Sequence, residues 1–220
     1  EIKNPLTPIQ LSAERLEMKL NGKLVASDQA ILTKSVKTIV DQVDAMKRLV
    51  NDFRDYARLP AAELKPVDLN GLVTDVLQLY EGVGQSVPVR AELDAASPKV
   101  MGDAQQLRQV IHNLLQNALD ASESSQVSTD TDRSVVVRTQ YQRPPGRVRL
   151  SVLDSGSGFP DYILKRAFEP YVTTKAKGTG LGLAVVKKIA DEHGSRIDIV
   201  NRVSDGEVVG AQVSLSLAAD

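Results

Sequence analysis

Apolar residues in the first quarter of the chain recur at the period of a packed helix. They follow one another at alternating spacings of four and three residues, which is the heptad period of a coiled coil or a helical bundle. This pattern predicts one long helix over residues 28–58. The positions of this heptad seam are Leu32, Val36, Ile39, Val43, Met46, Val50, Phe53 and Ala57.

A weaker helical pattern precedes the long helix. It covers residues 1–20, where Pro5 and Pro8 interrupt it, and Asn21-Gly22-Lys23 ends it. Residues 1–58 are therefore predicted to form a helical hairpin. Because two helices enclose little core, the hairpin either packs on its own chain or forms half of a four-helix bundle completed by a second subunit, and the pattern leaves both open.

Mixed helical and strand patterns follow a linker at residues 59–66, where two prolines flank a short polar stretch. In the domain of residues 67–220, Asp103 is predicted to cap a helix, with Gln106 completing a capping box. The order of elements predicts a two-layer α/β sandwich with a mostly antiparallel sheet, and an α+β chain as a whole. Helices are expected at 69–80, 103–121 and 181–193, strands at 87–93, 135–142, 147–153, 196–201 and 208–217, and a solvated loop at 122–134.

Composition and charge exclude several classes of protein. A chain of 220 residues with 42% hydrophobic and 25% charged residues is typical of a globular protein. The net charge of -1 gives no argument for nucleic acid, and the absence of cysteine excludes a disulfide framework, a thiolate nucleophile and a cysteine zinc site. No apolar run is long enough to span a bilayer, so any membrane attachment is expected to come from segments upstream.

Two asparagines on the helix over 103–121 are the first candidate for chemistry. Asn113 and Asn117 are four residues apart, so their amide side chains share one helix face. Amide oxygens suit Mg²⁺, which takes few protein ligands and completes its shell with water and phosphate oxygens. The same spacing also describes an ordinary polar stripe on an amphipathic helix.

Two glycine-containing segments are the next candidates. Asp154 ends a strand and is followed by Gly156 and Gly158, so its carboxylate could accept a hydrogen bond from an amino group on a flat ring, or it could simply start a turn. The second segment opens a helix, where free N–H groups and the helix dipole favour phosphate. It consists of Gly178, Thr179, Gly180, Leu181, Gly182 and Leu183.

A fourth segment, Phe168–Lys175, lies just before the second glycine segment. This segment is either a short surface connection or it places Lys175 where its ammonium group can contact a phosphate.

In this order and spacing, the four segments resemble the N, G1, F and G2 boxes of the ATP-binding fold shared by histidine kinases, gyrase, Hsp90 and MutL. Gln109–Ala118 resembles the N box, Asp154–Gly158 the G1 box and Gly178–Leu183 the G2 box. Ser155 stands where many relatives carry Asn, and Ser195 where they often have a second Gly.

The resemblance implies ATP and Mg²⁺ as ligands and a role for each segment. It implies that Asp154 receives the adenine amino group, that Asn117 coordinates Mg²⁺ and that Asn113 lies near the phosphates. The segment Val172–Gly180 is implied to be an ATP lid. Its glycine N–H groups and Lys175 would hold the γ-phosphoryl group in line with an incoming imidazole.

The start of the chain selects the histidine kinase branch. Glu1-Ile2-Lys3-Asn4-Pro5 resembles the H box of that family, which reads His-Glu-x-x-Asn-Pro, from its second position onward. The phospho-accepting histidine is expected just before Glu1, because His112 lies within the N box helix and His193 at a helix end looks like a cap. The stretch from Glu1 to Leu16 is especially similar to NtrY-like sensor kinases of nitrogen regulation.

Two H-box residues receive implied roles from the same resemblance. Glu1 would take the proton of the neighbouring imidazole or orient its tautomer. Asn4 would either position a water that dephosphorylates a response regulator or cap the turn before Pro5.

The whole pattern is identified as the cytoplasmic catalytic core of a two-component sensor histidine kinase, expected to belong to an inner-membrane-anchored sensor. The implied partners are a second copy of the chain, bound through the hairpin, and the receiver domain of a response regulator. Two alternatives remain: a nucleotide-binding pseudokinase that serves as a scaffold, and an ATPase clamp of the gyrase or MutL type.

Overall fold

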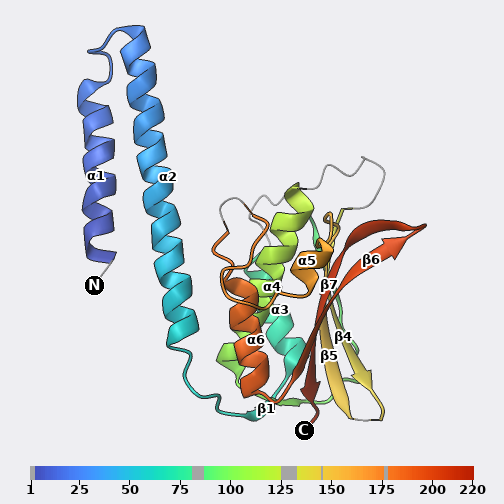
Figure 1. The fold of residues 1–220 in the computed structure, drawn as a ribbon. Helices are drawn as coiled ribbons and strands as arrows, with labels where there is room; N and C mark the ends of the chain where they lie inside the picture. Colours follow the sequence, from blue (N-terminus) through green and yellow to red (C-terminus); the bar gives the residue numbers. More distant parts are fainter. Residues whose placement is uncertain (1–2, 81–86, 125–132, 145, 176–177) are drawn as a thin grey trace. The chain divides into compact units, whose positions relative to one another are not determined.

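The computed structural model describes residues 3–80, 87–124, 133–144, 146–175 and 178–220. They form two compact units, whose relative position is not determined (Figure 1). The helical unit comprises Glu1–Leu59 with Thr174–Thr179, and the sheet unit comprises Pro60–Thr173 with Gly180–Asp220.

The helical unit is an antiparallel hairpin of α1 (Lys3–Leu20) and α2 (Ala26–Ala57), as the heptad seam predicts (Figure 1). The seam divides into two faces with a period of seven residues. Val36 and Val43 are buried within the hairpin, at 3% and 4% exposure. Three other members lie on a second face that is 41–53% exposed in the single chain, and they are Ile39, Met46 and Phe53.

The sheet unit is built on a five-stranded sheet in the order β2-β4-β5-β7-β6. Only β2 and β4 run parallel, so the sheet is mostly antiparallel, as predicted. The strands are β2 (Val89–Glu92), β4 (Val135–Gln142), β5 (Arg147–Leu153), β6 (Arg196–Ser204) and β7 (Glu207–Ala218).

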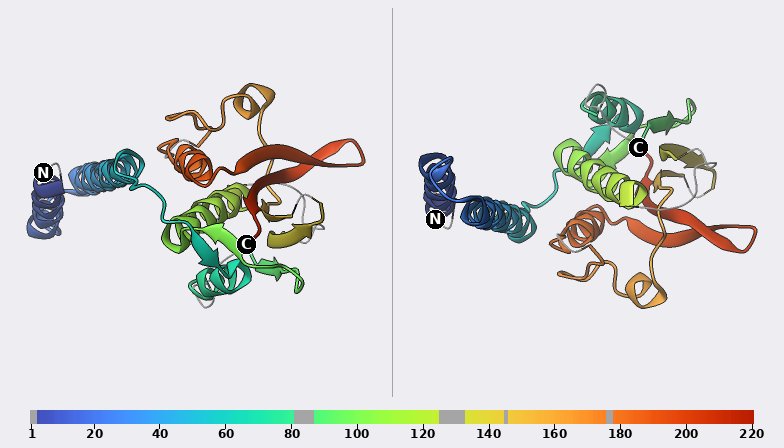
Figure 2. Two further views of the ribbon diagram at one scale, coloured as in Figure 1. Left: turned by 90° about the horizontal axis from the view of Figure 1, so that it is seen from below. Right: turned by 90° about the horizontal axis from the view of Figure 1, so that it is seen from above.

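Helices cover one face of this sheet and confirm the two-layer architecture (Figures 1 and 2). They are α3 (Leu69–Gln78), α4 (Ala104–Ser124) and α6 (Gly182–Glu192), and a short α5 (Asp161–Leu164) precedes α6. Helix α4 lies between α3 and α6 (Figure 2). Its Ile111 and Leu115 are fully buried. Leu150 of β5 and Leu215 of β7 are also fully buried, because alternate strand residues point to the helical layer.

Two short strands were not predicted. Strands β1 (Lys65–Val67) and β3 (Val100–Gly102) pair antiparallel in a sheet of their own, and β1 takes up the last two residues of the stretch predicted as a linker. Three residues are too few to show a strand period.

The predicted loop at residues 122–134 is wrong at its start. Helix α4 continues through Ser124, and Ser122 is fully buried. The Ser122 hydroxyl accepts a hydrogen bond from the Ser155 N–H, so tertiary contact overrides the weak helix propensity of serine. Residues 125–132 of this prediction lie outside the described residues.

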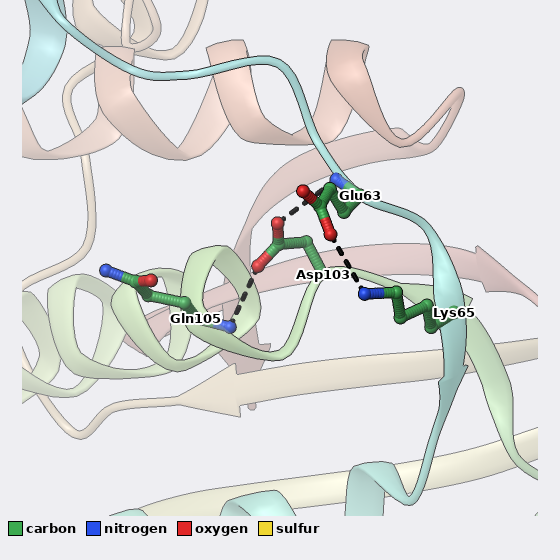
Figure 3. A network of polar contacts seen from close by, with 4 residues as sticks. All are labelled: Glu63, Lys65, Asp103 and Gln105. Carbon is green, nitrogen blue, oxygen red and sulfur yellow. Dashed lines mark hydrogen bonds and ion pairs between the residues drawn. The ribbon is translucent and has the colours of Figure 1, made fainter.

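Asp103 caps α4, as predicted. Its Oδ1 accepts from the Gln105 N–H at 2.9 Å, and its Oδ2 accepts from the Glu63 N–H at 3.1 Å (Figure 3). Oδ1 also accepts from the Gln106 N–H at 3.1 Å. The capping box, however, is wrong. The Gln106 side chain donates to the Pro60 carbonyl at 2.9 Å instead of turning back to Asp103.

His193 accepts the hydrogen bond from the Asp103 N–H that the Gln106 side chain would accept in a capping box. Its Nε2 accepts from the Asp103 N–H at 2.9 Å, and its Nδ1 lies 2.8 Å from the Ile189 carbonyl oxygen. Since the carbonyl can only accept, Nδ1 carries the proton and the ring is the neutral Nδ1–H tautomer. His193 therefore caps α6, as predicted, and joins the end of α6 to the start of α4.

The pKa of Asp103 reflects these bonds. Burial raises the pKa, but the backbone N–H groups of Gln106, Glu63 and Gln105 stabilise the carboxylate more and hold the pKa below its ordinary value. Because the pKa is lower in the folded chain, the ionised group stabilises the fold above about pH 4, and this contribution is lost as the pH falls through the lowered pKa.

We predict that Asp103→Ala lowers the free energy of unfolding by about 1–2 kcal/mol at neutral pH, because α4 loses its cap. Asp75→Ala is a matched control, since Asp75 forms an exposed ion pair with Arg108 and its loss should cost less than about 1 kcal/mol. Urea denaturation followed by circular dichroism measures both. The deficit of Asp103→Ala should shrink as the pH falls below about 4, and a constant deficit would contradict the assignment.

Candidate nucleotide site

Helix α4 carries the predicted asparagines next to the start of α6. Asn113 and Asn117 are both half-buried on the same face. Asn113 Nδ2 donates to the Gly182 carbonyl at 3.5 Å, and Asn117 Nδ2 lies 3.5 Å from the place that a Cβ at Gly182 would occupy. The asparagine pair and the helix opened by the second glycine segment therefore lie side by side.

Asp154 directly follows β5 and carries a buried carboxylate, with 6% exposure. Its Oδ1 accepts from the N–H groups of Gly156 and Ala211, both at 2.9 Å, and its own N–H donates to the Ala211 carbonyl at 3.0 Å. These bonds offset the cost of burying the charge. They also fix the direction of the second carboxylate oxygen.

Ser155 ties the loop after Asp154 to two other elements. Its N–H donates to the Ser122 hydroxyl of α4 at 3.1 Å. Its own hydroxyl donates to the Ser134 carbonyl at 2.8 Å and accepts from the Ser134 N–H at 3.2 Å. Gly156 lies against Ala121, where a Cβ would come within 2.8 Å of the alanine methyl group. The residue that replaces Asn in this chain therefore links α4 to the entry of β4.

Strands β6 and β7 hold the same loop from the other side. A Cβ on Gly210 would lie 2.0 Å from the Asp154 carbonyl oxygen, and Gly210 has a φ of +148°, so only glycine fits. Arg202 Nη1 donates to that oxygen at 2.7 Å. Asn201 bonds the main chain of Phe159. Sequence reasoning missed these residues and Ser122, because nothing in the pattern of β6 or α4 distinguishes them from surface polar positions.

The segment that begins at Phe168 and the glycine segment at the start of α6 are joined by a main-chain hydrogen bond. The Tyr171 N–H donates to the Gly180 carbonyl at 3.0 Å, and Tyr171 has a φ of +66°. Leu181 is fully buried and stands at the N-cap of α6. The base of the predicted lid is thus held by a backbone hydrogen bond.

The remaining predicted site residues belong to the helical unit or lie outside the described residues. Lys175, Gly178 and Thr179 belong to the segment that groups with the helical unit, and Asn4 falls in the first turn of α1. Glu1 lies outside the described residues, as do residues 176–177 of the predicted lid. Their roles remain those implied by the resemblance.

His112 faces α3. Its Nδ1 lies 2.6 Å from the Tyr80 hydroxyl, and burial together with the charge of Asp120 raises the pKa of Tyr80. Among the described residues, no three His, Cys, Asp or Glu side chains gather as a metal site. No described helix is long and apolar enough to cross a membrane.

Comparison with known proteins gives two matching families. Residues 1–62 match the His Kinase A (phospho-acceptor) domain, and residues 102–219 match the histidine kinase-, DNA gyrase B- and HSP90-like ATPase domain.

The chain is also similar to curated bacterial proteins, which include a nitrogen regulation protein and a sensory histidine kinase/phosphatase. It is 37% identical to the nitrogen regulation protein NtrY of Azorhizobium caulinodans over 220 residues, which is the whole chain and 28% of that protein. It is 34% identical to the sensory histidine kinase/phosphatase NtrB of Rhodobacter capsulatus over 213 residues, covering 90% of the chain and 55% of that protein. The chain therefore spans only part of each relative.

A solved structure shares the fold over the full chain. Full-length ShkA in complex with AMPPNP matches with a TM-score of 0.70 and 27% identity, over 100% of this chain and 44% of ShkA. Together with the sheet topology, the buried Asp154 and the asparagine pair beside α6, these matches show that the chain belongs to the histidine kinase-, DNA gyrase B- and HSP90-like ATPase family and carries a His Kinase A domain before the ATPase domain.

Proposed function

We propose that this chain is the catalytic core of a sensor histidine kinase that binds Mg-ATP in the sheet unit. In the longer protein, the γ-phosphoryl group passes to a histidine just before Glu1 and then to an aspartate of a response regulator. The similarity to NtrY supports a role in nitrogen-related signalling. The observation that carries the proposal is the buried carboxylate of Asp154 at the end of β5.

Asp154 has the chemistry that recognises adenine. An ionised carboxylate only accepts hydrogen bonds, so it favours the amino group of adenine over a ring that presents an oxygen at the same place. Its bonds from Gly156 and Ala211 hold it in one orientation before ligand arrives, which reduces the entropy lost on binding.

The asparagine pair suits the phosphate end of the nucleotide. Asn117 would give its amide oxygen to Mg²⁺, and Asn113 would lie close to the phosphates beside the N-terminal end of α6, where N–H groups favour anions. When bound, Mg²⁺ neutralises charge on the phosphates. The amide oxygens fit this ion, because Mg²⁺ needs few protein ligands and takes the rest of its shell from phosphate and water.

The transfer itself is assigned to residues outside this group. Lys175 and the N–H groups of Gly178–Gly180 would hold the γ-phosphoryl group, while Glu1 accepts the proton of the attacking imidazole. Asn4 would position water for the reverse function, dephosphorylation of the response regulator. The similarity to NtrB, which is named a kinase/phosphatase, supports this second role.

The proposed functional form is a dimer through the hairpin. His Kinase A domains dimerise, and the second face of the seam, with Ile39, Met46 and Phe53, is exposed in the single chain. Burying this face against a second copy would complete a four-helix bundle. The scaffold alternative uses the same dimer and the same nucleotide site but lacks an acceptor histidine.

Asp154→Asn should weaken ATP binding by about 10- to 100-fold, because a charged acceptor is replaced by a neutral amide that can present a donor. Isothermal titration calorimetry on the folded variant measures the loss. Asp198→Asn is the matched control, since Asp198 is bonded to Arg196 on β6. Near-normal ATP affinity in a folded Asp154→Asn protein would overturn the adenine assignment.

Asn117→Ala should weaken Mg-ATP far more than Mg-free ATP, because only the metal complex uses the amide oxygen. The two affinities are compared by calorimetry with and without Mg²⁺. Gln116→Ala is the control on the same helix, because the exposed Gln116 side chain bonds Asp120. Equal losses with and without Mg²⁺ would assign Asn117 a packing role.

A chain extended upstream by its natural sequence, with the expected histidine before Glu1, should incorporate acid-labile phosphate from labelled ATP, whereas residues 1–220 should not. Phosphoryl transfer is fast only to a nucleophile held in line, and His112 and His193 are engaged with Tyr80 and with the main chain. Replacing the added histidine by glutamine should abolish labelling. Labelling of His112 or His193 would refute the mechanism, and an unlabelled extended chain with normal ATP affinity would favour the scaffold.

A further inference from the structure

Asn201 of β6 makes a paired hydrogen bond to a single residue of the loop after Asp154. Its Oδ1 accepts from the Phe159 N–H and its Nδ2 donates to the Phe159 carbonyl, both at 2.8 Å. An amide side chain is suited to this, because it presents one donor and one acceptor side by side. The half-buried Asn201 therefore fixes both polar groups of the Phe159 main chain.

The next residue of β6 fixes the opposite end of the loop. Arg202 Nη1 donates to the Asp154 carbonyl at 2.7 Å. Gly158 has a φ of +72°, and its Cβ would lie 2.8 Å from Asn201 Oδ1, so the loop and β6 approach as closely as glycine permits. Two consecutive residues of one strand thus hold Asp154 and Phe159, the first and last residues of the loop.

The register of the sheet explains how one strand reaches both ends. Asn201 is paired with Ala211, whose N–H holds the Asp154 carboxylate, and Arg202 is paired with Gly210. The register shifts directly after Arg202, and such irregularities re-aim neighbouring side chains. The absence of a side chain at Gly210 leaves the Asp154 carbonyl in contact with β7 and accessible to Arg202.

We propose that Asn201, assisted by Arg202, is a positioning residue for adenine recognition. It sets the place of the Asp154 carboxylate without touching the nucleotide. The inference rests on the proposed adenine role of Asp154. A loop with glycines at two of its six positions has many accessible conformations, and each bond from β6 removes part of that freedom before the nucleotide binds.

The test compares ATP with inosine triphosphate, whose ring carries an oxygen where adenine has its amino group. Wild-type protein should prefer ATP, because only the amino group donates to Asp154. Asn201→Ala should weaken ATP binding by about 5- to 10-fold, the value expected for one or two neutral hydrogen bonds. Inosine triphosphate affinity should stay within about twofold, so the preference collapses. Calorimetry on the whole chain measures both ligands.

Two further variants keep the outcome decisive. Arg202→Ala should lower the ATP preference in the same direction. Its matched control is Arg196→Ala on the same strand, because the Arg196 guanidinium pairs with Asp198. If Asn201→Ala does not fold, the inference is tested by comparing the ATP preference of Arg202→Ala with that of Arg196→Ala. Asn201→Asp, which keeps the acceptor for the Phe159 N–H but sets an anionic oxygen against the Phe159 carbonyl, should lower the ATP preference at least as much as alanine.

The results separate this inference from the proposed function. Equal weakening of both nucleotides, or no change, in the Asn201 and Arg202 variants would show a merely structural role and overturn the inference. If Asp154→Asn abolishes the ATP preference while these variants keep it, only the inference fails. If Asp154→Asn keeps the preference, the adenine role of Asp154 fails and the inference fails with it.

Discussion

Burying one carboxylate at the end of β5 governs the local structure of the sheet unit. A charge with 6% exposure needs donors, and the main chain supplies them from Gly156 within the loop and from Ala211 on β7. These bonds require close backbone approach, which explains why Gly210 stands where any side chain would collide with Asp154. The conformation of the loop, the position of β7 and the hydrogen bonds from β6 are therefore all linked to the burial of the Asp154 carboxylate.

Helix α4 connects this loop to the rest of the proposed site. Its C-terminal turn receives the Ser155 N–H, its middle presents Asn113 and Asn117 to α6, and its start is held by Asp103. His193 at the end of α6 accepts a hydrogen bond from the Asp103 N–H and so connects α6 to the start of α4. A single rigid helix thus relates the adenine end of the proposed site to its phosphate end.

The elements with a clear period were predictable, and the contacts that organise the site were not. The long helix α2, the hairpin of β4 and β5, and the shared face of Asn113 and Asn117 follow from spacing alone. Strands β1 and β3 are too short to show a period. The capping box failed because His193, ninety residues distant, competes for the Asp103 N–H. Such long-range partners leave no local trace in a sequence, and the same holds for Asn201 and Ser122.

Ser155 has a consequence for how this domain tolerates change. By bonding Ser122 on one side and Ser134 on the other, it clamps both ends of the stretch that joins α4 to β4. A displacement of the end of α4 or of the entry of β4 is therefore passed through Ser155 to Asp154, its neighbour in the chain. Substitutions that shift either serine should change the position of the Asp154 carboxylate, although neither serine is a proposed contact of the nucleotide.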